Sequence, residues 1–225
     1  MSRTATYQGY EVNLYPLDNV GITAGPDAVN HIVTGVSDTG LWDNGWHTQQ
    51  NDPLYAPCTM EYVAYSSIGN TQMFRSVNPV WIPGYSSPQY VTMSFSHSNT
   101  LYYTTIGDIV PQGAHFYDTG TYGIASGAHV HMCLMIGSRS SMWPVGQNPT
   151  YGGIFYSPNP PANIAAFFYV PEDATISSGW GLDWTRWEGM PEFNAKIAII
   201  NLLLKRRKKK GGVLYGIDTG LIRDR

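Results

Sequence analysis

The sequence contains little cysteine and no long apolar run. Its two cysteines in 225 residues, Cys58 and Cys133, are too few for a disulfide scaffold and lack the spacing of a thiolate zinc site. We therefore expect two buried thiols. No stretch approaches the ~18 apolar residues of a membrane span. The N-terminus also lacks an apolar segment of signal-peptide length, so we expect no secretory signal.

Charged residues are also scarce, at 13% of the chain, and they are unevenly placed. Six of the 13 Lys and Arg residues form the run KRRKKK at 205–210. Without that run the balance is 7 − 16, or −9, so the main body is mildly acidic. An acidic body argues against a general attraction to nucleic acid.

Turn-forming and aromatic residues are plentiful, with 24 Gly, 15 Pro and 16 Tyr. This composition predicts an all-β fold, an antiparallel sheet or sandwich with long loops. The strand candidates are residues 12–24, 53–67, 70–77, 90–97, 129–137 and 164–170. After Pro171 the pattern changes to Trp-rich turns, then an apolar block, then the basic run. We therefore predict a domain over 1–170 and a short, partly helical appendage over 171–225.

Two histidines stand one residue apart in the apolar stretch SGAHVHMCLMIG, residues 126–137. In a strand, positions i and i+2 point to the same face, so His129 and His131 would project together. Val130, Met132 and Leu134 would then form the opposite, buried face. Such a pair also arises by chance, and buried structural histidines are the alternative reading.

The residues around this pair follow a longer pattern. Residues 106–134, IGDIVPQGAHFYDTGTYGIASGAHVHMCL, contain a G-D-x-V-x-x-G turn, a strand, a Gly-rich loop and then H-x-H. This order resembles the C-terminal half of the M23 zinc peptidases, the lysostaphin-like endopeptidases of peptidoglycan. Upstream, NHIVTGVSD (30–38), PLYAP (53–57) and YVTMSFSH (90–97) follow the same family order. The resemblance runs from about residue 10 to residue 137.

The resemblance implies a Zn²⁺ site and a pair of catalytic histidines. His31, Asp38 and His131 would be the three metal ligands, and N and O donors with one open position suit a catalytic zinc. Zinc lowers the pKa of its water toward ~7 and polarises a peptide carbonyl. His97 and His129 would flank that water, one taking a proton and the other stabilising the oxyanion.

The carboxylate ligand has a competitor in Asp43, within GLWDNGW. Many family members have a shorter H-x-x-x-D spacing than the one between His31 and Asp38. We favour Asp38 because the strand-like TGVSD directly follows His31. His47 and His115 are expected at surface or loop positions, with no chemistry assigned.

The resemblance also implies a substrate, the peptide cross-links of bacterial peptidoglycan. Aromatic-rich loops at 40–47, 80–90 and 141–156 are candidates for the walls of a substrate groove, and equally for covers of a small core. The alternative function is a catalytically inactive M23-like structural or wall-binding tail protein. Zinc content and wall digestion separate these two.

The expected setting is a bacteriophage virion, with the enzyme mounted on the tail and acting on the host wall. A free endolysin remains the alternative. Residues 171–225 would dock onto another phage tail protein, with the apolar segments buried there and the basic run facing an acidic surface. A membrane-active role for the basic tail is a further, weaker alternative.

Overall fold

The computed structural model describes most of the chain between residues 3 and 188. The described residues are 3–24, 36–39, 51–123, 125, 127–143, 145–146, 154–155, 159–161, 163–178 and 180–188. For a few strand residues, among them 36–39, only the backbone is described. Among the described residues no helix is long and apolar enough to cross a membrane.

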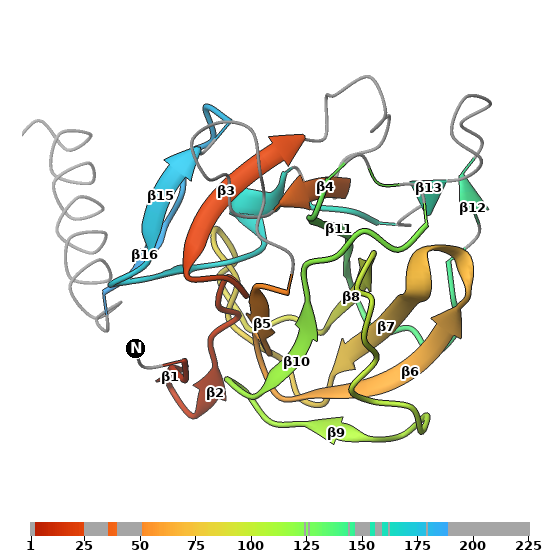
Figure 1. Cartoon of the computed structure of the whole chain (residues 1–225). Coiled ribbons are helices and arrows are strands. Elements are labelled where there is room, and N and C mark those ends of the chain that lie inside the picture. Colours follow the sequence, from red (N-terminus) through yellow and green to blue (C-terminus); the bar gives the residue numbers. More distant parts are fainter. Residues whose placement is uncertain are drawn as a thin grey trace, which may run out of the picture. The chain divides into compact units, whose positions relative to one another are not determined.

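An eight-stranded sheet forms the body of the molecule (Figure 1). Its strands are, in spatial order, β15 (Thr175–Ser178), β3 (Asn19–Ala24), β4 (Val36–Thr39), β11 (Val130–Ile136), β8 (Val91–Ser96), β7 (Thr71–Ser76), β6 (Met60–Ser66) and β9 (Ile109–Val110). All neighbours run antiparallel except β15 and β3, which are parallel. Strands β4 and β8 flank β11, so β11 occupies the middle of the sheet.

Four two-stranded sheets and two short 3₁₀ helices complete the described structure. The pairs are β1 (Thr6–Tyr7) with β2 (Tyr10–Glu11), β5 (Pro53–Tyr55) with β10 (His115–Asp118), β12 (Val145–Gly146) with β13 (Ile154–Phe155), and β14 (Val170–Pro171) with β16 (Arg186–Trp187). The 3₁₀ helices are η1 (Ile68–Asn70) and η2 (Ile164–Ala166). The all-β, mainly antiparallel class predicted from composition is confirmed.

The core lies on one face of the central strands, as their alternating sequence predicts. Val130, Met132 and Leu134 of β11 are fully buried in the main apolar cluster. Phe74, Phe95 and Phe116 meet edge to face at centroid distances of 4.9 to 6.1 Å and join the large sheet to β10. Burial of aromatic side chains in this geometry is a main source of stability in a domain of this kind.

The other face of β11 is also covered. Cys133 and Met135 pack in a second, smaller cluster with Val63, Met73 and Trp143. Both cysteines are free and buried, as predicted. His131 lies on the same face as Cys133, so this smaller cluster supports the part of the sheet that carries the predicted site.

The strand predicted over 164–170 is wrong, because most of that segment does not extend. Residues Ile164–Ala166 form η2, which Asn163 caps by accepting a hydrogen bond from the Ala166 N–H at 3.0 Å. The same N–H also donates to the Asn163 carbonyl at 3.2 Å, so the Asn163 side chain adds a second acceptor at the start of this short helix. Only Val170 enters a strand, β14.

The first compact unit extends beyond the boundary predicted at residue 170, to Gly189. Strand β15 hydrogen-bonds to β3 in the large sheet, and Figure 1 shows blue β15 beside red β3. Trp184 packs edge to face on Tyr15, with ring centroids 5.5 Å apart. Residues 190–225, which carry the apolar block and the basic run, lie outside the described residues.

Candidate functional site

The register of the central strands sets the position of His131. In the antiparallel pairing of β11 with β4, His131 lies directly opposite Asp38. On the other side of β11, His131 lies opposite Ser96, and His97 follows as the first residue after β8. Directly opposed positions share one face of a sheet, so the positions of Asp38, His131 and Ser96 lie side by side on one face, and His97 follows where the chain leaves β8.

The three imidazoles predicted to act together do lie together. The ring centroids of His97 and His129 are 4.6 Å apart, and those of His97 and His131 are 5.9 Å apart. His131 is 8% exposed, whereas His97 and His129 are half-buried. The cluster therefore has one buried ring and two rings that reach the surface.

The backbone of His97 adopts a conformation that few non-glycine residues use. Its φ is +85°, in the left-handed region. The His97 N–H donates to the Gly69 carbonyl at 2.6 Å, and the His97 carbonyl accepts from the Tyr122 N–H at 2.9 Å. A strained backbone of this kind costs about 1–3 kcal/mol and persists only where its surroundings hold it.

Backbone carbonyls fix the orientation of two of the rings. His97 Nδ1 lies 2.8 Å from the Tyr122 carbonyl oxygen, and His129 Nδ1 lies 2.8 Å from the Gly127 carbonyl oxygen. Because a carbonyl can only accept, each Nδ1 carries the proton and donates. The lone pair of each neutral ring is then at Nε2, where it can take a proton from another group.

Gly120 joins the backbones of His97 and His129. Its N–H donates to the His129 carbonyl at 3.0 Å, and its carbonyl accepts from the His129 N–H at 3.1 Å. A Cβ at residue 120 would lie 2.1 Å from the His97 carbonyl oxygen and 2.8 Å from Ser98 Cα. Only a glycine lets these two backbone segments approach so closely.

The predicted metal ligands are described only in part. His31 and the competing ligand Asp43 lie outside the described residues, and so does the side chain of Asp38. Within the part of the chain that is described, no group of three or more His, Cys, Asp or Glu residues is arranged to hold a metal. The two ligand positions with a described backbone, Asp38 and His131, are opposed in the register of β4 and β11, and Asp and His are residue types that bind zinc.

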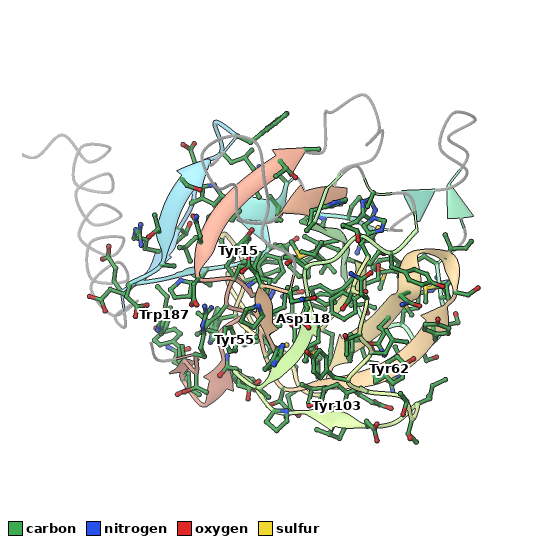
Figure 2. All side chains as sticks on the ribbon, in the orientation of Figure 1. Tyr15, Tyr55, Tyr62, Tyr103, Asp118 and Trp187 are labelled. Atoms are coloured by element: carbon green, nitrogen blue, oxygen red, sulfur yellow. The ribbon has the colours of Figure 1, made fainter. Side chains whose placement is uncertain are left out.

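His115 was expected to be a surface residue without chemistry, and it is exposed at the start of β10. Its Nε2, however, lies 2.6 Å from Oδ1 of the buried Asp118, whose Oδ2 accepts from the Tyr102 hydroxyl at 2.5 Å. Figure 2 labels Asp118 beside the β5 strand that carries Tyr55. We call His115, Asp118 and Tyr102 the His115 cluster. His115 and Asp118 both belong to β10, and the cluster was missed because Tyr102 joins them from a different segment.

The Asp118 carboxylate changes the acid–base behaviour of its neighbours. The hydrogen bond to Asp118 is the main cause, and burial the second, of a rise in the pKa of Tyr102 to about 12. Burial, followed by repulsion from Asp118, raises the pKa of Asp52. The hydroxyl of Tyr102 is therefore neutral at physiological pH and donates to the carboxylate.

The aromatic loops proposed as groove walls are only partly described. Trp81 stacks on Tyr7 with centroids 5.3 Å apart and donates to its carbonyl, and Trp143 is 2% exposed in the smaller cluster. The loop 40–47 lies outside the described residues.

Different side chains line the surface near His97. Tyr65, Ile68 and Tyr122 are 43%, 48% and 44% exposed, and they come from the end of β6, from η1 and from the loop that bonds His97. Sequence reasoning missed these residues because nothing in the motif marks which loops fold against the histidines. All three side chains are therefore accessible to solvent.

Comparison with known proteins finds likeness in structure only. No protein-family model matches the chain, and no curated protein matches it. The catalytic domain, in mutant form, of the prophage-encoded M23 protein EnpA from Enterococcus faecalis is 21% identical, over 47% of this chain and 69% of that chain, with a TM-score of 0.33. The catalytic domain of the antimicrobial peptidase lysostaphin from Staphylococcus simulans is 16% identical, over 53% of this chain and 80% of that chain, with a TM-score of 0.36.

A zinc containing peptidase from Vibrio cholerae is likewise similar over part of its length. It is 16% identical, covering 58% of this chain and 42% of that chain, with a TM-score of 0.40. This chain thus spans less than half the length of that peptidase. These structural neighbours are an M23 protein, lysostaphin and a zinc containing peptidase, each at low identity and partial coverage.

Proposed function

We propose that the chain is a zinc-dependent endopeptidase that cuts the peptide cross-links of bacterial peptidoglycan. The observation that carries the proposal is the meeting of His97, His129 and His131 at one place in the sheet, with Asp38 opposite His131. These residues are the ones that the M23-like motif order selects. The sequence pattern and the strand register therefore support one site.

In the proposed site, His31, Asp38 and His131 would hold the zinc. When bound, the metal would supply a Lewis acid for the peptide carbonyl and for water. The near burial of His131 limits its contact with solvent, which favours one ring orientation. The remaining two histidines would then do the proton chemistry.

The geometry of His97 and His129 suits proton transfer. Both rings carry their proton on Nδ1, held by a backbone carbonyl, so the Nε2 atom of either ring can take a proton from water. The protonated ring can then give that proton to the leaving amine or stabilise a developing oxyanion. The 4.6 Å centroid distance allows both rings to act on one peptide bond.

Two measurements on the purified full chain test this proposal. Metal analysis should find about one zinc per chain, and His131→Ala should abolish it. Digestion of purified walls from several Gram-positive species should release new amine ends, identified by mass spectrometry. A wild-type protein that binds walls without cutting them would favour the alternative, an inactive wall-binding tail protein. Full zinc content in His131→Ala would contradict the ligand set.

We also propose that the chain is delivered on a phage tail through its C-terminal part. The support is the sequence of residues 190–225, where apolar segments surround the basic run at 205–210. A chain ending at Gly189 keeps β14, β15 and β16, and should cut purified wall but fail to assemble into particles. Normal incorporation of that shortened chain would contradict the docking role.

A further inference from the structure

A buried thiol lies against the predicted metal ligand His131. Cys133 is two residues further along β11 and therefore on the same sheet face. Its Sγ is 3.6 Å from His131 Nε2, within hydrogen-bond range for sulfur. Cys133 is 0% exposed and His131 is 8% exposed, so this contact is buried.

The surroundings of Cys133 make the contact specific. The side chains that pack with it in the smaller cluster are apolar, namely Val63, Ala64, Met73, Met135 and Trp143. Ser94 lies opposite Cys133 in the register, but its buried hydroxyl has no hydrogen-bond partner among the described residues. His131 Nε2 therefore approaches a thiol that packs mainly among apolar side chains.

We propose that Cys133 is a positioning residue for His131, which deepens the proposed function and rests on it. If Nε2–H donates to Sγ, the lone pair of the neutral ring is at Nδ1, the atom left to bind zinc. Metal-binding histidines generally donate the N–H of their second ring nitrogen to a nearby acceptor, which fixes the tautomer and the ring orientation. Loss of that acceptor costs about 10–100-fold in metal affinity.

The first test is zinc affinity, measured by competition with a chromophoric chelator. Cys133→Val removes the acceptor at similar volume and should weaken zinc binding about 10–100-fold. Cys133→Ser keeps an acceptor and should restore most of that affinity. Cys58→Val is the matched control, because Cys58 is also free and 0% exposed but lies in the main core. Equal affinities for the Cys133→Val and Cys58→Val proteins would overturn the inference.

The second test is nitrogen NMR of the metal-free protein. The His131 ring should be in the Nε2–H form in the wild type and should shift toward a mixture in Cys133→Val. Cys133→Ala replaces the valine variant if that protein does not fold. An unchanged tautomer in the substituted protein would contradict the positioning role.

The two tests separate failure of the inference from failure of the proposed function. A wild-type chain that binds no zinc would contradict the proposed function. The NMR measurement on the metal-free protein would still test the contact between Cys133 and His131. A sulfur-to-cobalt charge-transfer band in the cobalt-loaded protein would identify Cys133 as a metal ligand, which would overturn its role as a positioning residue. The expected cobalt spectrum has no such band, and its d–d bands change in Cys133→Val.

Discussion

The molecule holds two groups of histidine side chains in different ways. In the proposed site, neutral backbone carbonyls hold the Nδ1 atoms of His97 and His129. In the His115 cluster, the buried carboxylate of Asp118 holds Nε2 of His115 and also accepts from Tyr102. A carbonyl orients a ring without adding a charge, whereas a carboxylate adds one and binds a protonated ring strongly. We expect wall-cutting activity to depend on His97 and His129, and stability to depend on the His115 cluster.

The strongest test of this difference removes single rings. His97→Ala and His129→Ala should each lower wall-cutting activity by about 10²–10⁴-fold, because a placed proton-transfer group is worth that much in rate. Both proteins should keep their zinc and their fold. His115→Ala is the control and should cut at nearly the wild-type rate. Loss of activity in that control would assign the His115 cluster to catalysis.

A smaller loss is expected from Gly120→Ala, which leaves every ring in place. The added methyl would meet the His97 carbonyl oxygen, so the backbone segments that carry the His97 and His129 rings must move apart. A displacement of about 1 Å can cost about 10²-fold in rate. We expect a drop of that size in kcat with unchanged zinc content.

The matched control for this change is Gly84→Ala. Gly84 also gains a methyl, but nothing lies within 4 Å of the added Cβ, and its φ of +80° predicts a loss of stability of about 1–2 kcal/mol. If the Gly84 and Gly120 variants lose activity equally, close packing at Gly120 does not set the ring spacing.

Asp118→Asn should affect stability rather than activity. The amide cannot accept from both Tyr102 and His115 as the carboxylate does, and a buried group is left poorly paired. The expected decrease in the free energy of unfolding is about 1–3 kcal/mol, measured by urea denaturation. Unchanged stability combined with lost activity would reverse the roles of the two histidine groups.

The smallest effect concerns the pH dependence of the link through Tyr102. Its folded pKa is raised from 10.0 to about 12, chiefly by the hydrogen bond to Asp118. A raised pKa means that the stabilisation is fully present below pH 10 and is lost as the pH rises toward 12. The difference in Tm between wild type and Tyr102→Phe should therefore be constant from pH 7 to 9 and shrink above pH 10. A difference that grows above pH 10 would contradict this sign.

Much of the central sheet could be predicted from the sequence. Strands β7, β8 and β11 lie within the predicted ranges, because each is a short run rich in strand-forming residues with turn residues beyond its ends. The meeting of His97, His129 and His131 was also predicted, from the order of the motif. Local pattern and motif order are therefore sufficient where strands are long and central.

Contacts between distant segments could not be predicted. His115 and Asp118 pair within β10, but the hydrogen bond from Tyr102 to Asp118 depends on how the loop after β8 folds back on β10. The segment 164–166 has apolar residues that suit a strand, but the cap at Asn163 turns it into a 3₁₀ helix. The continuation of the first unit to Gly189 depends on the pairing of β15 with β3, which no local signal marks.

The parallel pairing of β15 with β3 also constrains how the chain folds. The Ser177 hydroxyl donates to the Val20 carbonyl across 157 positions of sequence. The edge of β3 that pairs with β15 can therefore be covered only after almost all of the described residues have been made. Contacts of such separation form slowly, because a long loop must close before they give any stabilisation. During synthesis, β3 would leave the ribosome early and stay unpaired on that edge until residue 178 follows. An early, exposed strand of this kind is open to pairing with other chains, so we expect yields of soluble protein to be sensitive to the rate of translation.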